Sequence, residues 1–224
     1  MSTKENNASA NGQHHTGAIP ERKEIVKLGE VGLIESTTSD FKAQNRSTVM
    51  AAGDDAAVID YDPEGDFYTL ISTDLLLEGI GFDLIYFPLK HLGFKVLVIG
   101  INDILAMNGT PQQVTVSVGV SAKISVEQLD ELYEGIRAAC GQYGVDLVGG
   151  DTSASVNGLV ISVTATGRVE KKHIAYRSGA KANDLICITG DLGAAYMGLH
   201  LLEREKRAFE GHHDPQPKFE GYEY

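Results

Sequence analysis

Hydrophobic and polar positions along the first half of the chain predict a helix, a β-hairpin and a second, longer helix. Apolar residues near helical spacing in 24–34 predict a short helix that runs into a turn. Two runs rich in β-branched and aromatic residues, 56–61 and 67–72, flank a separator that contains proline and glycine, and this arrangement predicts a hairpin. Residues 88–107 repeat apolar positions at helical spacing from a proline onward, which suits a first helical turn.

The pattern that follows completes one domain. Residues 114–120 alternate apolar and polar positions and predict a strand, and Ser125 is placed to cap a helix that ends near residue 143. Two further strands are predicted at 145–148 and 158–169. The order strand, strand, helix, strand, helix, strand, strand predicts an α+β fold, in which a mixed β-sheet carries helices on one face.

A second unit is expected after Lys172. Residues 184–189 predict a strand, and a glycine-bracketed turn leads from it into a helix that ends near Arg207. One strand and one helix cannot bury their own apolar faces, so we interpret this segment as the opening of a further α/β domain whose remainder is absent. The predicted organisation is a disordered polar arm, an N-terminal domain and the start of a truncated C-terminal domain, at 1–20, 21–172 and 173–224.

Composition and charge narrow the classes of function. The chain has 224 residues, of which 42% are hydrophobic and 22% charged, as in ordinary globular proteins. Its formal net charge of -12 argues against nucleic-acid or anionic-membrane partners, because both require a basic face. No apolar run approaches the roughly 20 residues of a membrane span. The N-terminal residues lack the pattern of a signal or transit peptide, so a cytoplasmic location is expected.

Two cysteines, Cys140 and Cys187, are present without a CxxC pair or a Cys/His spacing. They predict neither a zinc site nor a disulfide framework, and buried, reduced thiols are the simplest interpretation.

Acidic motifs stand at the ends of four predicted elements, and they are Gly53-Asp54-Asp55, Ser72-Thr73-Asp74, Asn102-Asp103 and Gly149-Gly150-Asp151. In an antiparallel hairpin the start of one strand lies beside the end of its partner, so the first two motifs should meet. Carboxylates with hydroxyls beside them suit Mg²⁺ completed by water and phosphate oxygens, and neighbouring glycines let backbone N–H groups approach a phosphate. A solvated turn, or a capping or buried hydrogen-bonded Asp103, would explain the same residues without a metal. No Walker motif is present.

The chain carries, in order, the motifs GDDAAV, STDLLLEG, an H-x-x-x-K helix leading to INDILAMNGTP, then VGGDT and YRSGAKANDLICITGDLG. Over roughly 24–201 this series resembles thiamine-monophosphate kinases, whose superfamily includes aminoimidazole ribonucleotide synthetase and selenophosphate synthetase. The resemblance implies ATP-dependent, Mg²⁺-assisted phosphorylation of thiamine monophosphate to thiamine diphosphate. It also implies a homodimer that pairs the sheets of its N-terminal domains through the long strand 158–169, with ATP near the interface.

The resemblance also implies the roles of individual residues. The metal ligands would be Asp55, Ser72, Thr73, Asp74, Asp103 and Asp151. The nucleotide would be contacted by Gly150, Asp151 and Arg177, with Tyr133 as a looser match that a helix-surface tyrosine explains equally well. Asp54 would orient the backbone, and Lys95 is interpreted as a solvated or helix-capping lysine rather than a phosphate ligand. No catalytic acid or base is expected, because the attacking phosphate oxygen is already ionised at pH 7.

Several features depart from the pattern of these kinases. Gly81 stands where many members have a histidine near the substrate, and Asn183 replaces a common turn glycine, which asparagine can do because it tolerates a left-handed backbone. The C-terminal domain of these kinases is much longer, so this segment by itself is expected to turn over poorly. Two alternatives remain: a sister ATP-dependent synthetase, of which selenophosphate synthetase would need a reactive N-terminal cysteine, and a non-catalytic nucleotide-binding dimerisation module.

Overall fold

The computed structural model describes residues 24–210, and the chain divides into two units, 1–42 and 43–224. In the described part of the first unit lies the helix α1 (Ile25–Thr38), which is kinked where Gly29 adopts a φ of 66°. The helix predicted at 24–34 is therefore confirmed and extends by about one further turn. The predicted arm at 1–20 lies outside the described residues.

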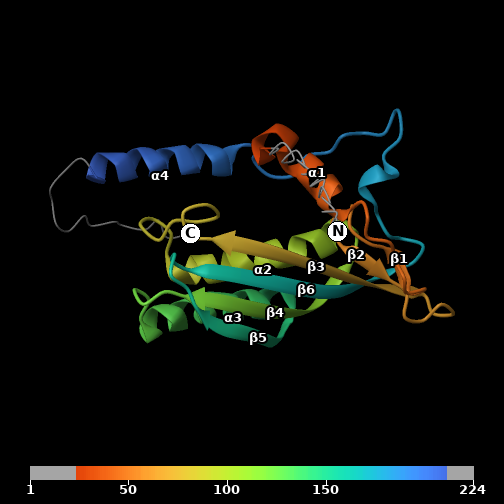
Figure 1. Ribbon diagram of the computed structural model, residues 1–224, viewed down its shortest axis with the longest axis horizontal. Helices are drawn as coiled ribbons and strands as arrows, with labels where there is room; N and C mark the ends of the chain where they lie inside the picture. Colours follow the sequence, from red (N-terminus) through yellow and green to blue (C-terminus); the bar gives the residue numbers. More distant parts are fainter. Residues whose placement is uncertain (1–23, 211–224) are drawn as a thin grey trace, which may run out of the picture. The chain divides into compact units, whose positions relative to one another are not determined.

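The second unit is built on a six-stranded sheet with the strand order β1-β2-β3-β6-β4-β5 (Figure 1). Adjacent strands pair antiparallel except β4 and β5, which are parallel, so the predicted mixed sheet is confirmed. The strands are β1 (Thr48–Met50), β2 (Ala57–Ile59), β3 (Phe67–Leu77), β4 (Thr110–Val120), β5 (Asp146–Ala154) and β6 (Val160–Glu170). The predicted hairpin is β2 and β3, and β3 continues five residues beyond its predicted end.

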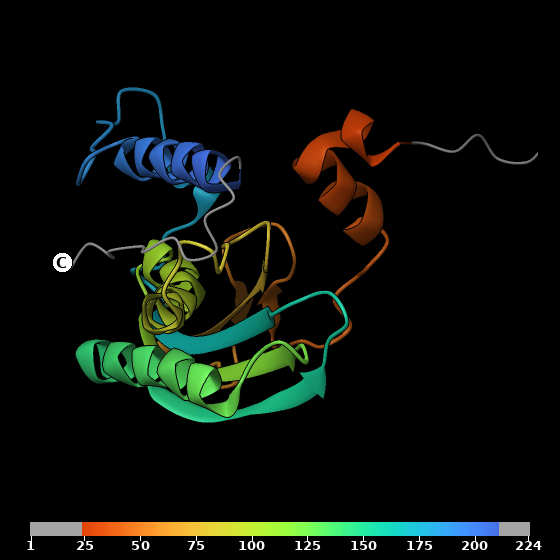
Figure 2. The ribbon, with the colours of Figure 1, turned by 90° about the vertical axis from the view of Figure 1, so that its left-hand side faces the viewer.

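Helices α2 (Leu89–Ala106) and α3 (Val126–Tyr143) cover one face of the sheet (Figures 1 and 2). The predicted cap at Ser125 is confirmed, because its hydroxyl accepts from the Gln128 N–H while the Gln128 side chain accepts from the Ser125 N–H. Helix α2 contacts β3, β4 and β6 directly, whereas α3 packs mainly on α2. Fully buried side chains of both helices and the sheet form one core, including Leu70, Leu97, Ile101, Ile104, Leu132, Ile136 and Ile161.

The two helices approach each other closely because each contributes a glycine to the contact. A Cβ built on Gly93 would lie 1.9 Å from the Leu132 carbonyl oxygen, and one built on Gly135 would lie 1.8 Å from that of Lys90. Neither backbone can yield without moving a helix, so these two positions fix the distance between α2 and α3.

We expect Gly93→Ala to lower the free energy of unfolding by about 3 kcal/mol, because the added methyl group forces the helices apart. Gly141→Ala is the matched control on α3, where an added Cβ meets nothing within 4 Å. There the substitution should stabilise the chain by about 0.5–1 kcal/mol through helix propensity. Urea unfolding of both variants measures the difference, and equal effects would contradict the close helix contact.

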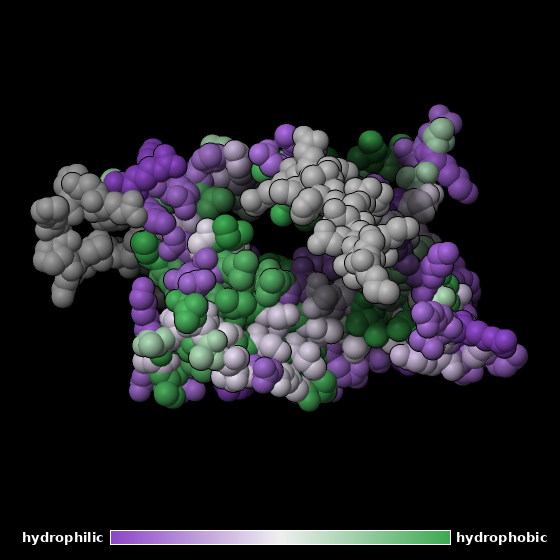
Figure 3. Space-filling view, viewed as in Figure 1, coloured by the Kyte–Doolittle hydropathy of each residue, from purple (hydrophilic) through white to green (hydrophobic). Residues whose placement is uncertain are grey.

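The opposite face of the sheet presents the alternate residues of each strand. Along β3, Leu75 is 63% exposed and Leu77 38% exposed on this face, whereas Leu70 and Leu76 face the helices and are buried. Figure 3 views this face and shows apolar side chains gathered over β3. We call it the open face below.

The segment after β6 differs from its prediction in one respect. It contains the short 3₁₀ helix η1 (Arg177–Gly179) and the predicted helix, α4 (Ala194–Glu210), but residues 184–189 form no strand. Leu185 and Ile186 are almost fully exposed. The strand prediction was wrong because an extended segment needs a neighbouring strand to satisfy its backbone groups, and none pairs with it among the described residues.

Helix α4 contacts the loop between β3 and α2 through two polar pairs. The Tyr86 hydroxyl donates to Glu203 at 2.7 Å, and the Lys206 ammonium pairs with Asp83. None of the helices described here is both long and apolar enough to cross a membrane.

Candidate functional site

The hairpin brings the first two acidic motifs together, as predicted. Ala57, the first residue of β2, pairs with Ile71, so Asp55, two residues before β2, comes beside the segment 72–74 of β3. The backbone N–H of Ala56 meets the sulfur of Met107 at 3.2 Å, which ties this end of the hairpin to the end of α2. The hairpin and the C-terminal half of α2 therefore form one acidic centre, defined here by Asp55, Asp74 and Asp103.

Asp74 faces the helices from β3, and its carboxylate lacks part of its hydrogen bonding there. Its Oδ2 atom is buried without a hydrogen-bond partner among the described residues, and burial raises the pKa of its carboxyl above the usual range. An ionised carboxylate in that position is costly unless a cation compensates for it. This unpaired oxygen is the strongest structural sign that the position suits a cation.

Asp103 lies on α2 in the same electrostatic environment. Burial raises the pKa of its carboxyl, the charges of Asp74 and Asp55 raise it further, and the Arg177 guanidinium lowers it. Repulsion among three carboxylates from three segments shows that they lie close enough to interact. The predicted grouping of Asp55, Asp74 and Asp103 is supported by these interactions.

Arg177 supplies the positive charge nearest to this centre. Its Nε donates to Asp55 Oδ1 at 2.9 Å, and its Nη2 contacts the same oxygen. Its backbone N–H also donates to both oxygens of Asp54, at 3.3 and 3.4 Å. Asp54 accepts from the Asp55 N–H at 2.9 Å as well, so its carboxylate organises the backbone, in agreement with its predicted role.

The two hydroxyl residues beside Asp74 point in opposite directions. Ser72 is buried on the helix side, where its hydroxyl donates to the Gly100 carbonyl at 3.1 Å. Thr73 lies on the open face, where its hydroxyl bonds to the Val163 carbonyl and to the Thr164 hydroxyl. The Thr73 side chain therefore faces away from Asp74, and a metal ligand from this residue would have to be its main-chain carbonyl.

A cation fits the acidic centre in chemistry but is not enclosed by it. The orphaned Asp74 oxygen and the mutual repulsion of the carboxylates favour a hard divalent ion with oxygen ligands. Within residues 24–210, however, no three His, Cys, Asp or Glu side chains stand close enough to hold a metal by themselves. Such open sites suit Mg²⁺, which keeps several waters and is completed by substrate phosphates.

Gly150 and Asp151 lie on the far edge of the sheet. Asp74, Val163, Val116 and Gly150 form one row across β3, β6, β4 and β5. Three strand spacings place Gly150 about 14 Å from Asp74 along that row. Asp151 pairs with Ser117 and so faces the open side of the sheet, opposite to Asp74. One chain therefore does not bring Asp151 to the other three carboxylates.

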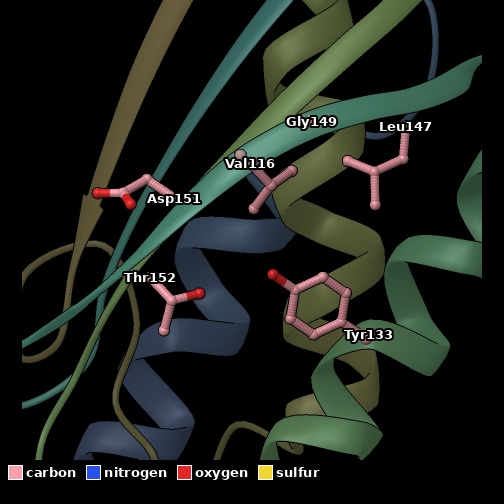
Figure 4. A pocket seen from close by; sticks show the side chains of 7 residues that line it. Val116, Tyr133, Leu147, Gly149, Asp151 and Thr152 are labelled. Atoms are coloured by element: carbon pink, nitrogen blue, oxygen red, sulfur yellow. The ribbon is translucent and has the colours of Figure 1, made fainter.

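A cavity of ≈ 430 Å³ adjoins this edge, between β5 and α3, and it is lined by Tyr133, Gly149, Gly150, Asp151 and Thr152 among others. In Figure 4 the Tyr133 hydroxyl points into the cavity toward Thr152, while the Asp151 carboxylate lies on the other side of β5. A Cβ on Gly150 would lie 1.9 Å from the Val116 carbonyl oxygen, so only glycine fits at this position.

The predicted substrate residue Gly81 lines a larger cavity of ≈ 1020 Å³, between the β3–α2 loop and α4, which we call the Gly81 cavity. Lys95 also lines it, and its ammonium donates to the Gly81 carbonyl at 2.9 Å. The interpretation of Lys95 as a solvated or capping lysine was wrong, because the side chain is half-buried and burial lowers its pKa. The sequence could have indicated this burial, because Lys95 stands between Phe94 and Val96 in an apolar helix.

Comparison with known proteins assigns this domain to a family. Residues 53–169 match the family model described as "AIR synthase related protein, N-terminal domain". The chain belongs to this family. The match begins at Gly53 and ends at Val169, so it contains all four acidic motifs of this chain.

Individual relatives are kinases. The thiamine-monophosphate kinase of Bacillus subtilis is 35% identical over 178 residues, which cover 80% of this chain and 54% of the relative. That of Rhodopirellula baltica is 36% identical over 154 residues, covering 66% and 48%. The chain thus spans about half the length of these curated relatives.

Solved structures agree with this comparison. A structure of AaThiL complexed with AMPPCP and TMP superposes with a TM-score of 0.73 at 29% identity, over 87% of this chain and 58% of that one. The thiamine-monophosphate kinase from Stenotrophomonas maltophilia gives a TM-score of 0.58 at 26% identity, over 78% and 52%. The predicted fold, with a mixed sheet and helices on one face, is therefore confirmed by known members of the superfamily.

Proposed function

We propose that this chain is the Mg²⁺- and ATP-binding part of a thiamine-monophosphate kinase, which transfers the γ-phosphoryl group of ATP directly to the phosphate of thiamine monophosphate. The observation that carries the proposal is the gathering of Asp55, Asp74 and Asp103 from three segments around an unsatisfied buried carboxylate oxygen. The similarity to kinases, and to a structure that contains AMPPCP, an ATP analogue, together with TMP, supports this substrate pair.

In this proposal Asp55, Asp74 and Asp103 hold Mg²⁺ through carboxylate oxygens, with Ser72 and the Thr73 carbonyl as further oxygen donors. Bound Mg²⁺ would screen the charges of two polyanions and polarise the transferred phosphoryl group. Arg177 would exchange its contact with Asp55 for a nucleotide phosphate, because its guanidinium is exposed beside the acidic centre. No side chain is needed as a general base, because the acceptor oxygen is ionised at neutral pH.

We infer that two copies of the chain build each nucleotide site. About three strand spacings separate Asp74 from Gly150, Asp151 and the cavity between β5 and α3. Asp151 faces the open side of the sheet. Pairing two open faces would bury the exposed Leu75 and Leu77 and bring the β5 edge of one copy toward the other. In such a dimer Asp151 would lie at the interface, whereas the Asp74 carboxylate stays on the helix side of its own sheet, so a site that joins the two would lie at the rim of the paired sheets.

The substrate would enter through the Gly81 cavity, which is lined by the β3–α2 loop, Lys95 of α2 and residues of α4. Its aromatic side chains suit the thiazolium and pyrimidine rings of thiamine. The acidic composition and the free cysteines fit a cytoplasmic enzyme.

A sister synthetase is the less favoured function. The selenophosphate reaction would need a reactive thiol, but burial raises the pKa of Cys140, which makes it a poorer nucleophile at neutral pH. Cys187 is exposed, so the interpretation of both cysteines as buried thiols was wrong for this residue, and it is not among the residues of the acidic centre.

Calorimetric titration of the chain with ATP, with and without Mg²⁺, tests the proposed function. We expect binding that depends on Mg²⁺, and formation of thiamine diphosphate from ATP and thiamine monophosphate at a rate below that of the longer relatives. Equal ATP binding with and without Mg²⁺ would refute the metal site. Tight Mg²⁺-dependent binding with no thiamine diphosphate formed would favour a nucleotide-binding module instead.

A further inference from the structure

Lys95 is a half-buried cation without a carboxylate partner. Its ammonium has three N–H donors, of which one is used by the Gly81 carbonyl, and it lies 5.1 Å from the centre of the Phe87 ring. Among the described residues, no Asp or Glu lies within ion-pair distance of it. Burial also lowers the pKa of Lys95, which means that its charge is incompletely solvated.

The second lysine of the Gly81 cavity, in contrast, has a carboxylate partner. Lys206 pairs with Asp83, and Glu203 accepts a hydrogen bond from the Tyr86 hydroxyl. These two carboxylates are therefore engaged with other partners, and the positive charge that the cavity offers to a ligand is that of Lys95. An anionic group is the ligand that would use its remaining donors.

The position of Lys95 on α2 relates this anion site to the acidic centre. Lys95 and Asp103 are eight residues apart on one helix, about a quarter of a turn from each other around it, and their Cα atoms lie about 12 Å from each other along the axis. The triphosphate of ATP would belong to the Asp103 end. An anion bound by Lys95 would approach the triphosphate from the Gly81 cavity. The acceptor of a phosphoryl group has to approach the donor in this way.

We propose that Lys95 binds the phosphate monoester of the acceptor substrate, while the aromatic lining of the Gly81 cavity receives the cationic heteroaromatic part. The inference rests on the proposed function and adds to it the residue that distinguishes a phosphorylated acceptor from its unphosphorylated form. The contact with Gly81 gives the same lysine a second task, because it holds the loop that forms the wall of the cavity.

Titrations of the chain with thiamine monophosphate and with thiamine separate these two tasks. We expect thiamine monophosphate to bind more tightly than thiamine. Lys95→Met should weaken binding of thiamine monophosphate by about 10- to 100-fold more than binding of thiamine, because loss of the Gly81 contact affects both ligands whereas loss of the charge affects only the phosphate. Lys95→Arg should retain most of the preference for the phosphate, and Lys95→Gln provides a neutral variant that keeps an N–H donor in the side chain.

Lys90→Met is the matched control, since Lys90 lies on the same helix, is exposed and pairs with Glu134. It should change neither affinity. If Lys95→Met and Lys95→Gln weaken binding of both ligands equally, the lysine only supports the loop. The proposal would also be overturned if these variants kept the preference for thiamine monophosphate, or if the unmodified chain showed no such preference. If the unmodified chain shows no Mg²⁺-dependent ATP binding, that result would instead count against the proposed function.

Discussion

Asp74→Asn is expected to raise the melting temperature of the metal-free chain at pH 7 and to abolish most of its Mg²⁺-dependent ATP binding. The first effect follows because the buried Asp74 carboxylate has an oxygen without a partner and lies near Asp55 and Asp103. The second follows because a metal ligand is removed, and even residues that only support ligands cost 10–100-fold in metal affinity, so a loss of about tenfold or more is expected.

The pH dependence of stability provides an independent measurement. Burial raises the pKa values of Asp74 and Asp103 in the folded chain, so their favourable contribution is complete below the unfolded value of about 3.9 and is lost as pH rises through the folded values. Without Mg²⁺ the chain should therefore lose stability over that window, and Asp74→Asn should lose less.

Asp130→Asn, which removes an exposed carboxylate on α3, is the control and should alter neither the melting temperature nor ATP binding appreciably. Calorimetric melting with and without Mg²⁺ and ATP makes the comparison. A variant at Asp74 that melts lower than the unmodified chain, or that still gains stability from Mg²⁺ and ATP together, would contradict the assignment of this carboxylate.

A mixture of two inactive variants is expected to recover nucleotide sites. If each site joins Asp74 of one copy to Asp151 of the other, then Asp74→Asn and Asp151→Asn dimers each lack any intact site. Dimers that contain one chain of each kind carry one doubly altered site and one intact site. Random pairing of equal amounts should therefore restore about one quarter of the sites of the unmodified protein.

The chains can be produced together with two different tags, so that the mixed dimers are isolated and their ATP stoichiometry is measured with Mg²⁺. Mixed dimers should bind about one ATP for each pair of chains. A mixture that stays inactive while mixed dimers form would show that Asp74 and Asp151 act within one chain. Full ATP binding by Asp151→Asn alone would remove this residue from the site.

Much of the fold was accessible from local sequence patterns. The turn between β2 and β3 fixed a hairpin, and the hairpin placed Asp55 beside the segment that contains Asp74, before any tertiary information was used. The cap at Ser125 and the apolar stripe of α2 were equally predictable, because the spacing of residues along one element decides them. The strand predicted at 184–189 was wrong, because a strand depends on a partner that its own sequence does not contain.

The site was predictable in its chemistry and less so in its geometry. The sequence supplied the carboxylates and their order, and it indicated hard, oxygen-liganded metal chemistry for them. It treated Asp151 as a fourth neighbour of Asp55, Asp74 and Asp103, whereas the strand order β3-β6-β4-β5 puts two strands between their positions. It also treated Lys95 as solvated, although the β3–α2 loop covers it.

The sequence by itself therefore determined which elements form, which face of each helix is apolar and which carboxylates the hairpin joins, since these follow from spacing within about 20 residues. Only the tertiary structure decided the face on which Thr73 and Asp151 lie, the distance between Asp74 and Gly150, and the burial of Lys95. The physical reason is that strand order and register are set by contacts between distant segments, and a shift of one residue in register moves a side chain to the other face of the sheet.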